Sequence, residues 1–255
     1  MTEIPKSHPR YLSLVTRERL VEMMRRGIVS EAGLIAHGRG EAFDYLIGEK
    51  SNDFAIKSEK AAVATMLLAE RPVISVNGNA AALSGKEIIG LGEILNAKIE
   101  VNLFHRTEDR VKKIVEYLES LGGRNILGPD PDARIPGLDH ARALCHKEGI
   151  YSADVVLVPL EDGDRAQALK NMGKTVITID LNPISRTARA SDITIVDNII
   201  RAIPNMISFS KDMKNLSIDD LKKVVKSYDN ADILKEALNA ISENAINEWE
   251  TQNRK

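Results

Sequence analysis

Short runs of β-branched and aliphatic residues alternate with longer amphipathic stretches between residues 73 and 198, and this alternation restricts the possible folds more than any other feature. Parallel strands can be joined only through long crossovers, so strands separated by helix-length segments are typical of parallel sheets. The sequence therefore predicts an α/β fold, a parallel sheet with crossover helices. Its expected strands are Val73–Val76, Ile99–Phe104, Val155–Val158, Thr175–Ile179 and Ile193–Val196.

Helical patterns lie on both sides of this region. Apolar residues recur at helical spacing in the first 71 residues, and turns are expected at the glycines there, Gly27, Gly33, Gly38 and Gly40. After Asn198 the chain is predicted to be helical almost to its end, with Asn230 as a cap or break. We expect one domain over residues 1–255, with an N-terminal helical layer (1–71), the α/β core (72–200) and C-terminal helices (201–255).

Charge and cysteine content narrow the class of partner. The 255 residues carry a net charge of only −2, and Lys and Arg are therefore not in the excess that a nucleic-acid-binding or membrane-binding surface would require. Cys145 is the one cysteine, which excludes an internal disulfide and fits a reducing compartment. It lies in a helix-like run, Leu138–Glu148, where we expect it to pack rather than react. Because no signal peptide or membrane-length apolar stretch is visible, we expect a cytoplasmic protein that acts on small ligands.

Polar residues follow every predicted strand, and ligands of open parallel sheets bind at the carboxyl ends of the strands. The first set, Asn77-Gly78-Asn79, leads into a predicted helix whose free amides suit a phosphate or carboxylate, although a tight turn with an N-cap explains it equally well. Neither a Walker A loop nor a dinucleotide-binding glycine motif is present. The other sets are His105-Arg106, Pro159–Asp162, Asp180–Pro183 and Asp197-Asn198.

The segment after the strand Thr175–Ile179 combines an acceptor with cations. Asp180 suits ribose hydroxyls, and Arg186 and Arg189 suit phosphates, unless the segment is only a solvated turn. The acidic residues Glu161, Asp162 and Asp164 could hold magnesium, but helix capping by Asp162 or Asp164 is the favoured interpretation.

Two basic elements lie near the N-terminus. One contains His8, Arg10 and Arg17, and the other is the segment His37-Gly38-Arg39-Gly40. Glycines on both sides would let the backbone approach a ligand, and the planar guanidinium of Arg39 would then clamp a phosphate. The alternative is a glycine-bounded turn that leaves Arg39 exposed.

Four segments together resemble the archaeal phosphopantothenate synthetases, also called 4-phosphopantoate–beta-alanine ligases, and the similarity extends over nearly the whole chain. The matching segments are Ile4–Tyr11, Ala32–Leu46, Ser75–Asn79 and Ile177–Pro183. The resemblance implies a homodimer with a Rossmann-like core. It also implies that ATP and magnesium are used to join 4-phosphopantoate to beta-alanine, giving 4'-phosphopantothenate for coenzyme A. The expected route passes through a phosphopantoyl adenylate and releases AMP and pyrophosphate.

The resemblance also suggests roles for individual residues. Its expected ATP contacts are Arg17, Arg39, Asp180, Leu181, Asn182, Arg186, Thr187, Asn198 and Ile199. The expected contacts of phosphopantoate are His8, Arg10, Asn77, Asn79, His105 and Arg106. Catalysis is expected to depend on Arg39, Asn77, Asn79 and His105, while no metal ligand and no general base for the amine can be assigned. A non-catalytic nucleotide-binding protein of the same fold remains the alternative.

Overall fold

A five-stranded parallel sheet forms the centre of the computed structural model, which describes residues 4–253 of the chain. The outermost residues of the predicted domain, 1–3 and 254–255, lie outside the described range. The strand order is β2-β1-β5-β6-β7, and every pairing is parallel, so the predicted α/β fold is confirmed. The strands are β1 (Pro72–Val76), β2 (Lys98–Val101), β5 (Val155–Pro159), β6 (Thr175–Ile179) and β7 (Ile193–Ile195).

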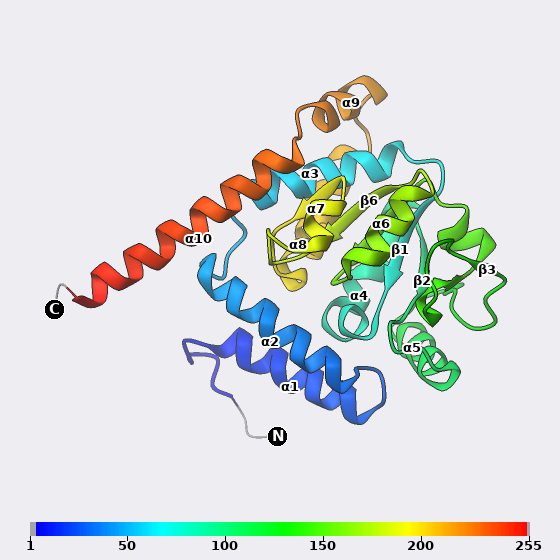
Figure 1. Cartoon of the computed structure of the whole chain (residues 1–255), viewed down its shortest axis with the longest axis horizontal. Helices are drawn as coiled ribbons and strands as arrows, with labels where there is room; N and C mark the ends of the chain where they lie inside the picture. Colours follow the sequence, from blue (N-terminus) through cyan, green and yellow to red (C-terminus); the bar gives the residue numbers. More distant parts are fainter. Residues whose placement is uncertain (1–3, 254–255) are drawn as a thin grey trace.

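Helices cover the sheet, and further helices form the N-terminal and C-terminal parts of the chain (Figure 1). The N-terminal helices are α1 (Tyr11–Arg25), α2 (Glu31–Leu46) and α3 (Asp53–Leu68). The crossovers contain α4 (Gly78–Leu95), α5 (Glu108–Ser120), α6 (Gly163–Asn171) and α7 (Arg186–Ala190). The chain ends with α8 (Ile199–Met213), α9 (Ile218–Lys226) and α10 (Asn230–Asn253), so the predicted C-terminal helices and the break at Asn230 are confirmed.

The central strands are buried on both faces because other elements cover each side of the sheet, and consecutive strand residues point to opposite sides. Ile74 and Leu157 belong to a large cluster that includes residues of α3, α4, α5 and α8. Val156 and Val176 belong to a second cluster with α6 and the segment 135–150. This burial explains why the central strands can be predicted as nearly continuous apolar runs.

The α2 helix corrects one prediction. Gly33, Gly38 and Gly40 do not mark turns, because all three lie within α2, and Arg39 is therefore on a helix rather than a glycine-bounded loop. Each glycine inside a helix costs about 1 kcal/mol relative to alanine. Ser30 offsets part of this cost by capping the helix, since its side chain accepts from the Gly33 amide. Gly27, with φ of 77°, does mark a turn.

Two further predictions about local structure are wrong. The run around Cys145 is not one helix, since Leu144–Cys145 forms β4, paired antiparallel with β3 (Ala133–Arg134), between a short 3-10 helix at Ala141–Ala143 and a π-helix at Lys147–Tyr151. Cys145 is buried there, as expected of a packing residue. The β2 strand ends at Val101 rather than Phe104, because Asn102 turns its side chain to the loop carbonyls of Arg142 and Leu144.

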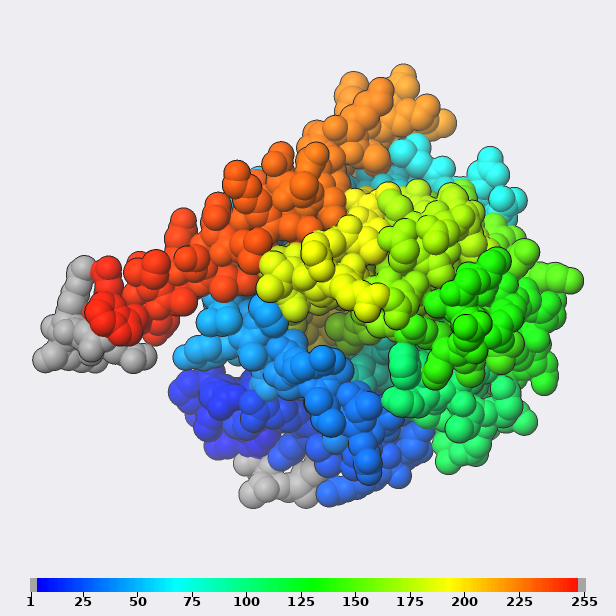
Figure 2. Space-filling view, in the orientation of Figure 1, coloured from blue at the N-terminus to red at the C-terminus, as the bar shows by residue number. Residues whose placement is uncertain are grey.

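The C-terminal part of α10 extends away from the rest of the molecule, as the space-filling view shows (Figure 2). Its first turns pack on the body, where Ile233, Leu234 and Ala237 are buried with residues of α3 and β7. Farther along, Ile246 and Trp249 are 54% and 67% exposed. Among residues 4–253, no helix has the length and apolarity needed to cross a membrane.

Candidate active site

The carboxyl ends of β1 and β5 meet at the point where the chain connections diverge in opposite directions along the sheet. Asn77 joins these two ends. Its amide nitrogen donates to the carbonyls of Pro159 and Leu160 at 3.0 and 3.1 Å, and its oxygen accepts from the Ala80 amide at 3.0 Å. Asn77 is thus the N-cap of α4, as the capping alternative predicted, and it fixes the shape of the site edge.

Helix α2 lies across this edge through close contacts at its glycines. Asn79 donates to the Gly33 carbonyl at 2.8 Å, and a Cβ atom added to Gly33 would lie 2.4 Å from the Asn79 side-chain oxygen. A Cβ atom at Gly40 would lie 3.6 Å from Leu181, which follows β6. Close packing against the end of β1 therefore requires glycine at position 33, whereas a Cβ atom at Gly40 would make an ordinary contact and one at Gly38 would meet no other atom within 4 Å.

The turn after β6 holds a buried acceptor. One carboxylate oxygen of Asp180 accepts from the Asn182 amide at 2.9 Å and the other from the Ser185 hydroxyl at 2.5 Å. Burial raises the pKa of Asp180, against the opposing effects of these two hydrogen bonds and of the nearby Arg39 guanidinium. Each oxygen keeps a second lone pair, so Asp180 can still accept from a ligand hydroxyl.

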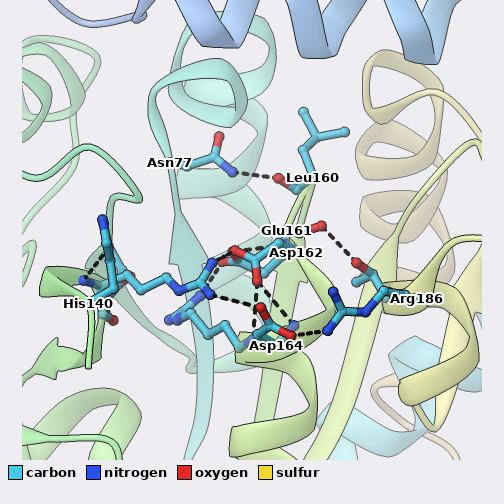
Figure 3. Close-up of polar contacts among 11 residues, drawn as sticks. Asn77, His140, Leu160, Glu161, Asp162, Asp164 and Arg186 are labelled. Carbon is cyan, nitrogen blue, oxygen red and sulfur yellow. Dashed lines mark hydrogen bonds and ion pairs between the residues drawn. The ribbon is translucent and has the colours of Figure 1, made fainter. Parts of the chain in front are cut away.

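A group of charged side chains lies beside the ends of β5 and β6, and we call it the open cluster: Arg142, Asp162, Asp164 and Arg186. Asp164 pairs with Arg186, and Asp162 pairs with Arg142, as the dashed lines in Figure 3 indicate. Asp162 is also the N-cap of α6, accepting from the amides of Asp164 and Arg165, so the capping interpretation is confirmed. A groove of about 690 Å³ adjoins the cluster and is lined by α6, α7 and the segment 136–142.

Thr187 and Arg186 link the β6 turn to the β5 end. The Thr187 hydroxyl donates to the Glu161 carbonyl at 2.9 Å, and Thr187 is buried. Arg186, by contrast, is 70% exposed, so its guanidinium can reach an incoming ligand.

A second charged group lies between α2 and the start of α8, and we call it the buried cluster: Asp44, Glu59, Asp197 and Arg201. Arg201 donates to Asp44 at 2.5 Å and to Asp197 at 2.6 Å. Burial, reinforced by the neighbouring Asp197 carboxylate, raises the pKa of Glu59 to about 9. Sequence analysis missed this cluster, and the only available signal was the helical spacing of Asp197 and Arg201.

The buried cluster positions one of the predicted ATP residues. Asn198 caps α8 and donates to Asp44 of α2 at 2.7 Å. Ile199 follows with its side chain in the core, so only its backbone amide, at the start of α8, can face a ligand.

The predicted residues of the N-terminal segment reach α2 but are exposed. Arg17 donates through Nε to both carboxylate oxygens of Glu41 at 3.0 and 2.9 Å, and Arg10 lies 3.8 Å from the same carboxylate. His8 accepts from the amide of Arg10. These contacts hold the cations at the α1–α2 side of the edge.

His105 and Arg106 lie farther out, after the edge strand β2. The Arg106 side chain is only 3% exposed and donates to the Gly128 carbonyl at 2.8 Å. His105 is exposed, and its carbonyl accepts from Arg110. Both residues thus make local loop contacts, and the structure does not bring them into the ring of side chains around Asn77 and Asp180.

Comparison with known proteins assigns the chain to a family. The sequence model of the phosphopantothenate/pantothenate synthetases matches residues 54–244. A 4-phosphopantoate–beta-alanine ligase of Thermococcus kodakarensis is 58% identical over 239 residues, covering 93% of this chain and 92% of the relative. The chain belongs to the phosphopantothenate/pantothenate synthetase family. Relatives of the same name from Methanosarcina mazei and Methanospirillum hungatei are 55% and 49% identical over 95% and 96% of this chain.

The site has the parts that a synthetase of this family needs for charged substrates. Arg39 of α2 lies close enough to Asp180 to influence the pKa of its carboxyl, and Arg186, in α7 after the same turn, pairs with Asp164. In the described part of the chain, no three His, Cys, Asp or Glu side chains are grouped to hold a metal ion. The protein's own residues therefore offer charge neutralisation and positioning rather than a ready-made metal centre.

Proposed function

We propose that the protein condenses 4-phosphopantoate with beta-alanine at the expense of ATP, giving 4'-phosphopantothenate, AMP and pyrophosphate for coenzyme A biosynthesis. The observation that carries the proposal is the Arg39 guanidinium of α2 near the Asp180 carboxylate in the turn after β6, with Arg186 following in α7, in a member of this synthetase family. The names of the relatives supply the two substrates.

In this proposal ATP lies across the ends of β6 and β7. The Asp180 carboxylate accepts from the ribose hydroxyls, and the amide at the start of α8 faces a phosphate, as helix N-termini commonly do. Arg39 and Arg186 neutralise the phosphate chain, with Leu181, Asn182 and Thr187 shaping the pocket wall. Arg17 joins them by exchanging its partner Glu41 for a phosphate oxygen.

Phosphopantoate takes the β1 side of the edge in this proposal. Its anionic groups face Asn77, Asn79 and the amides that begin α4, with His8 and Arg10 approaching from the N-terminal segment. His105 and Arg106 stay predictions for the phosphate, and they would have to leave their present loop contacts to reach it.

The reaction asks little covalent chemistry of the protein. The phosphopantoate carboxylate attacks the α-phosphorus of ATP and pyrophosphate leaves, after which the amine of beta-alanine attacks the acyl carbon and AMP leaves. Positioning and neutralisation of developing charge account for most of the catalysis of such displacements. Arginines from two elements that converge on one site are suited to this task.

Magnesium is proposed to enter as the counter-ion of ATP. The acidic side chains at the end of β5, Asp162 and Asp164, are engaged by arginines and by the cap of α6, so they do not form a vacant ligand set. Magnesium usually retains waters and binds substrate phosphates, which fits this arrangement. A homodimer in the cytoplasm, implied by the family resemblance, remains part of the proposal.

Incubation of the purified protein with ATP, magnesium, 4-phosphopantoate and beta-alanine, followed by mass spectrometry, tests the reaction. We expect 4'-phosphopantothenate with equal amounts of AMP and pyrophosphate. ADP and orthophosphate in place of these would indicate an acyl phosphate and contradict the adenylate route. ATP that binds without being consumed would instead favour a non-catalytic nucleotide-binding protein.

Replacement of 4-phosphopantoate by pantoate tests the phosphate pocket in the same assay. Pantoate should be a poor substrate, because cationic groups left without their anion in a protected site are costly. Equal efficiency with both acids would remove the phosphate pocket from the proposal.

A further inference from the structure

One face of α2 is directed at the strand ends along its whole length. Residues four, seven and eleven positions after Gly33 share that face of a helix, and they are His37, Gly40 and Asp44. Three of the four have contacts that fix the direction: Gly33 at Asn79 after β1, Gly40 at Leu181 after β6, and Asp44 at Asn198 after β7. His37 lies between the first two, so its side chain is carried to the part of the edge between β1 and β6.

The His37 imidazole is half-buried there, and one of its nitrogens is unused. Its Nε2 atom is inaccessible to solvent and has no hydrogen-bond partner among residues 4–253. Buried polar atoms are nearly always paired, so an unpaired ring nitrogen at a substrate site suggests a ligand as its partner. Glu41, one turn farther along α2, does not serve as that partner, because it accepts hydrogen bonds from Ser13 and Arg17 of α1.

The surroundings favour the neutral form of this imidazole. Burial lowers the pKa of His37, the carboxylate of Glu41 opposes this, Arg17 of α1 lowers the pKa further, and Asp44 opposes it. The other charged groups at this edge are Arg39 on α2 and Asp180 beyond Gly40. A neutral imidazole protonated at Nδ1 carries a lone pair at Nε2 and can accept a proton there.

None of the other four histidines of the sequence is placed in this way. His8 and His140 each use Nδ1 to accept a backbone amide near the chain surface. His105 is exposed after the edge strand β2, and His146 packs beside Glu100 near β4. The position at the strand ends thus distinguishes His37 from the rest.

We propose that His37 is the general base of the ligation step, accepting a proton at Nε2 from the amine of beta-alanine. This inference rests on the proposed function. Beta-alanine first loses one ammonium proton to solvent, and its nitrogen lone pair then forms the bond to the acyl carbon of the adenylate. The second proton passes to His37, and the acyl–oxygen bond breaks with its electron pair leaving on AMP. The imidazolium then returns its proton to water.

The test separates the two half-reactions in His37→Gln. Exchange of labelled pyrophosphate into ATP, with 4-phosphopantoate and without beta-alanine, reports adenylation, while synthesis of 4'-phosphopantothenate reports both steps. Exchange should stay within about threefold of wild type, whereas synthesis should fall by about a hundredfold or more, the usual contribution of a general base. His146→Gln is the matched control, because its Nε2 is also buried and unpaired among the described residues, and it should retain synthesis.

Two further measurements exclude a structural role. Hydroxylamine, which is largely unprotonated at neutral pH, should trap the adenylate almost as fast in the variant as in wild type. The loss of synthesis at acidic pH should be less steep in His37→Gln, since one titrating group has been removed.

Synthesis by His37→Gln within about threefold of wild type, below the contribution expected of a base, would overturn the inference. So would a parallel loss of exchange and synthesis, which would make His37 an ATP-site or folding residue. If wild type itself gave neither exchange nor synthesis, the proposed function would fail, and the role of His37 with it.

Discussion

The buried cluster and the open cluster both pair arginine with carboxylates at strand ends, but water reaches them to different extents. Asp197 in the buried cluster is 0% exposed, and Arg201 spans it and Asp44. In the open cluster, Arg186 is 70% and Asp164 is 52% exposed. The two clusters therefore contain the same types of residue, and the exposure of each ion pair to water decides its contribution.

Removal of one partner from a buried pair leaves an unpaired charge in a poor solvent, so the buried cluster is fixed once the protein has folded. An exposed pair contributes about 1 kcal/mol or less and can be exchanged for another anion. The buried cluster therefore holds α2 against α8, whereas the open cluster leaves Arg186 exposed to solvent in a weak ion pair, which suits the phosphate-binding role proposed for it. Substitutions in both clusters and at Arg39 test this division.

The largest effect is expected from Arg201→Ala, which would leave Asp44 and Asp197 buried without their cation. The free energy of unfolding should fall by about 3–5 kcal/mol, measured by urea denaturation. Arg186→Ala is the control and should cost about 1 kcal/mol or less, because that pair is exposed. Equal losses in the two variants would break the comparison.

Arg39→Ala tests whether Arg39 on α2 binds the phosphates of ATP, as is proposed for Arg186 of the open cluster. Loss of a charge-assisted contact to the leaving pyrophosphate should raise the activation barrier by about 2–4 kcal/mol, on the order of a hundredfold in rate. Arg39→Lys should fall between the two, since it keeps the charge but loses the planar fork. Thermal melting should be unchanged, because Arg39 is exposed. Turnover within about twofold of wild type would remove Arg39 from the site.

A smaller effect on catalysis is expected at the open cluster itself. Arg186→Ala should lower kcat/KM for ATP, and the loss should correspond to the free energy of one charged hydrogen bond, about 1.5–3 kcal/mol. Asp164→Asn should act in the opposite direction and tighten ATP binding, because it removes the carboxylate that competes for Arg186. Weaker ATP binding by Asp164→Asn would show that the pair positions Arg186 instead of occupying it.

The smallest change in stability is expected for Glu59→Gln at acidic pH, where the Glu side chain of wild type and the Gln side chain of the variant are both neutral and similar in shape. The pKa of Glu59 is about 9 in the fold against 4.5 ordinarily, so the folded protein keeps a proton that the unfolded chain releases above pH 4.5. This contribution to stability is complete below pH 4.5 and is lost as the pH rises toward 9. The melting temperature of the variant should therefore exceed that of wild type increasingly across this range. A constant difference would contradict a protonated Glu59.

The sheet could be predicted from sequence because its strands are buried on both faces and therefore read as apolar runs. Thr175–Ile179 has the same bounds in the structure, and the other predicted strands differ mainly at their ends. The N-terminal helical layer was predicted, but the continuity of α2 was not, because local preference counts its glycines as turn signals. The close contact that requires Gly33 is made with Asn79, 46 positions away in the sequence.

The candidate site was predicted in part for a similar reason. All parallel strands end at one edge, so Asn77, Asp180 and Asn198 could be placed together from their positions after strands. Arg106 also follows a strand, yet its side chain turns back to the Gly128 carbonyl. Position after a strand fixes where a backbone lies, whereas the direction of a long side chain depends on which partners surround it.

The sequence by itself determined the α/β class, the polar residues that follow the strands and the family, because periodicity, strand ends and long motifs are local properties of the chain. Only the tertiary structure decided which charged residues are fixed and which are available. Asn198 and Asp44 are 154 positions apart and meet at 2.7 Å, and His37 gains its unpaired nitrogen only when α2 lies on the strand ends. Burial and pairing arise from such distant contacts, and they set the charge and the freedom of each side chain.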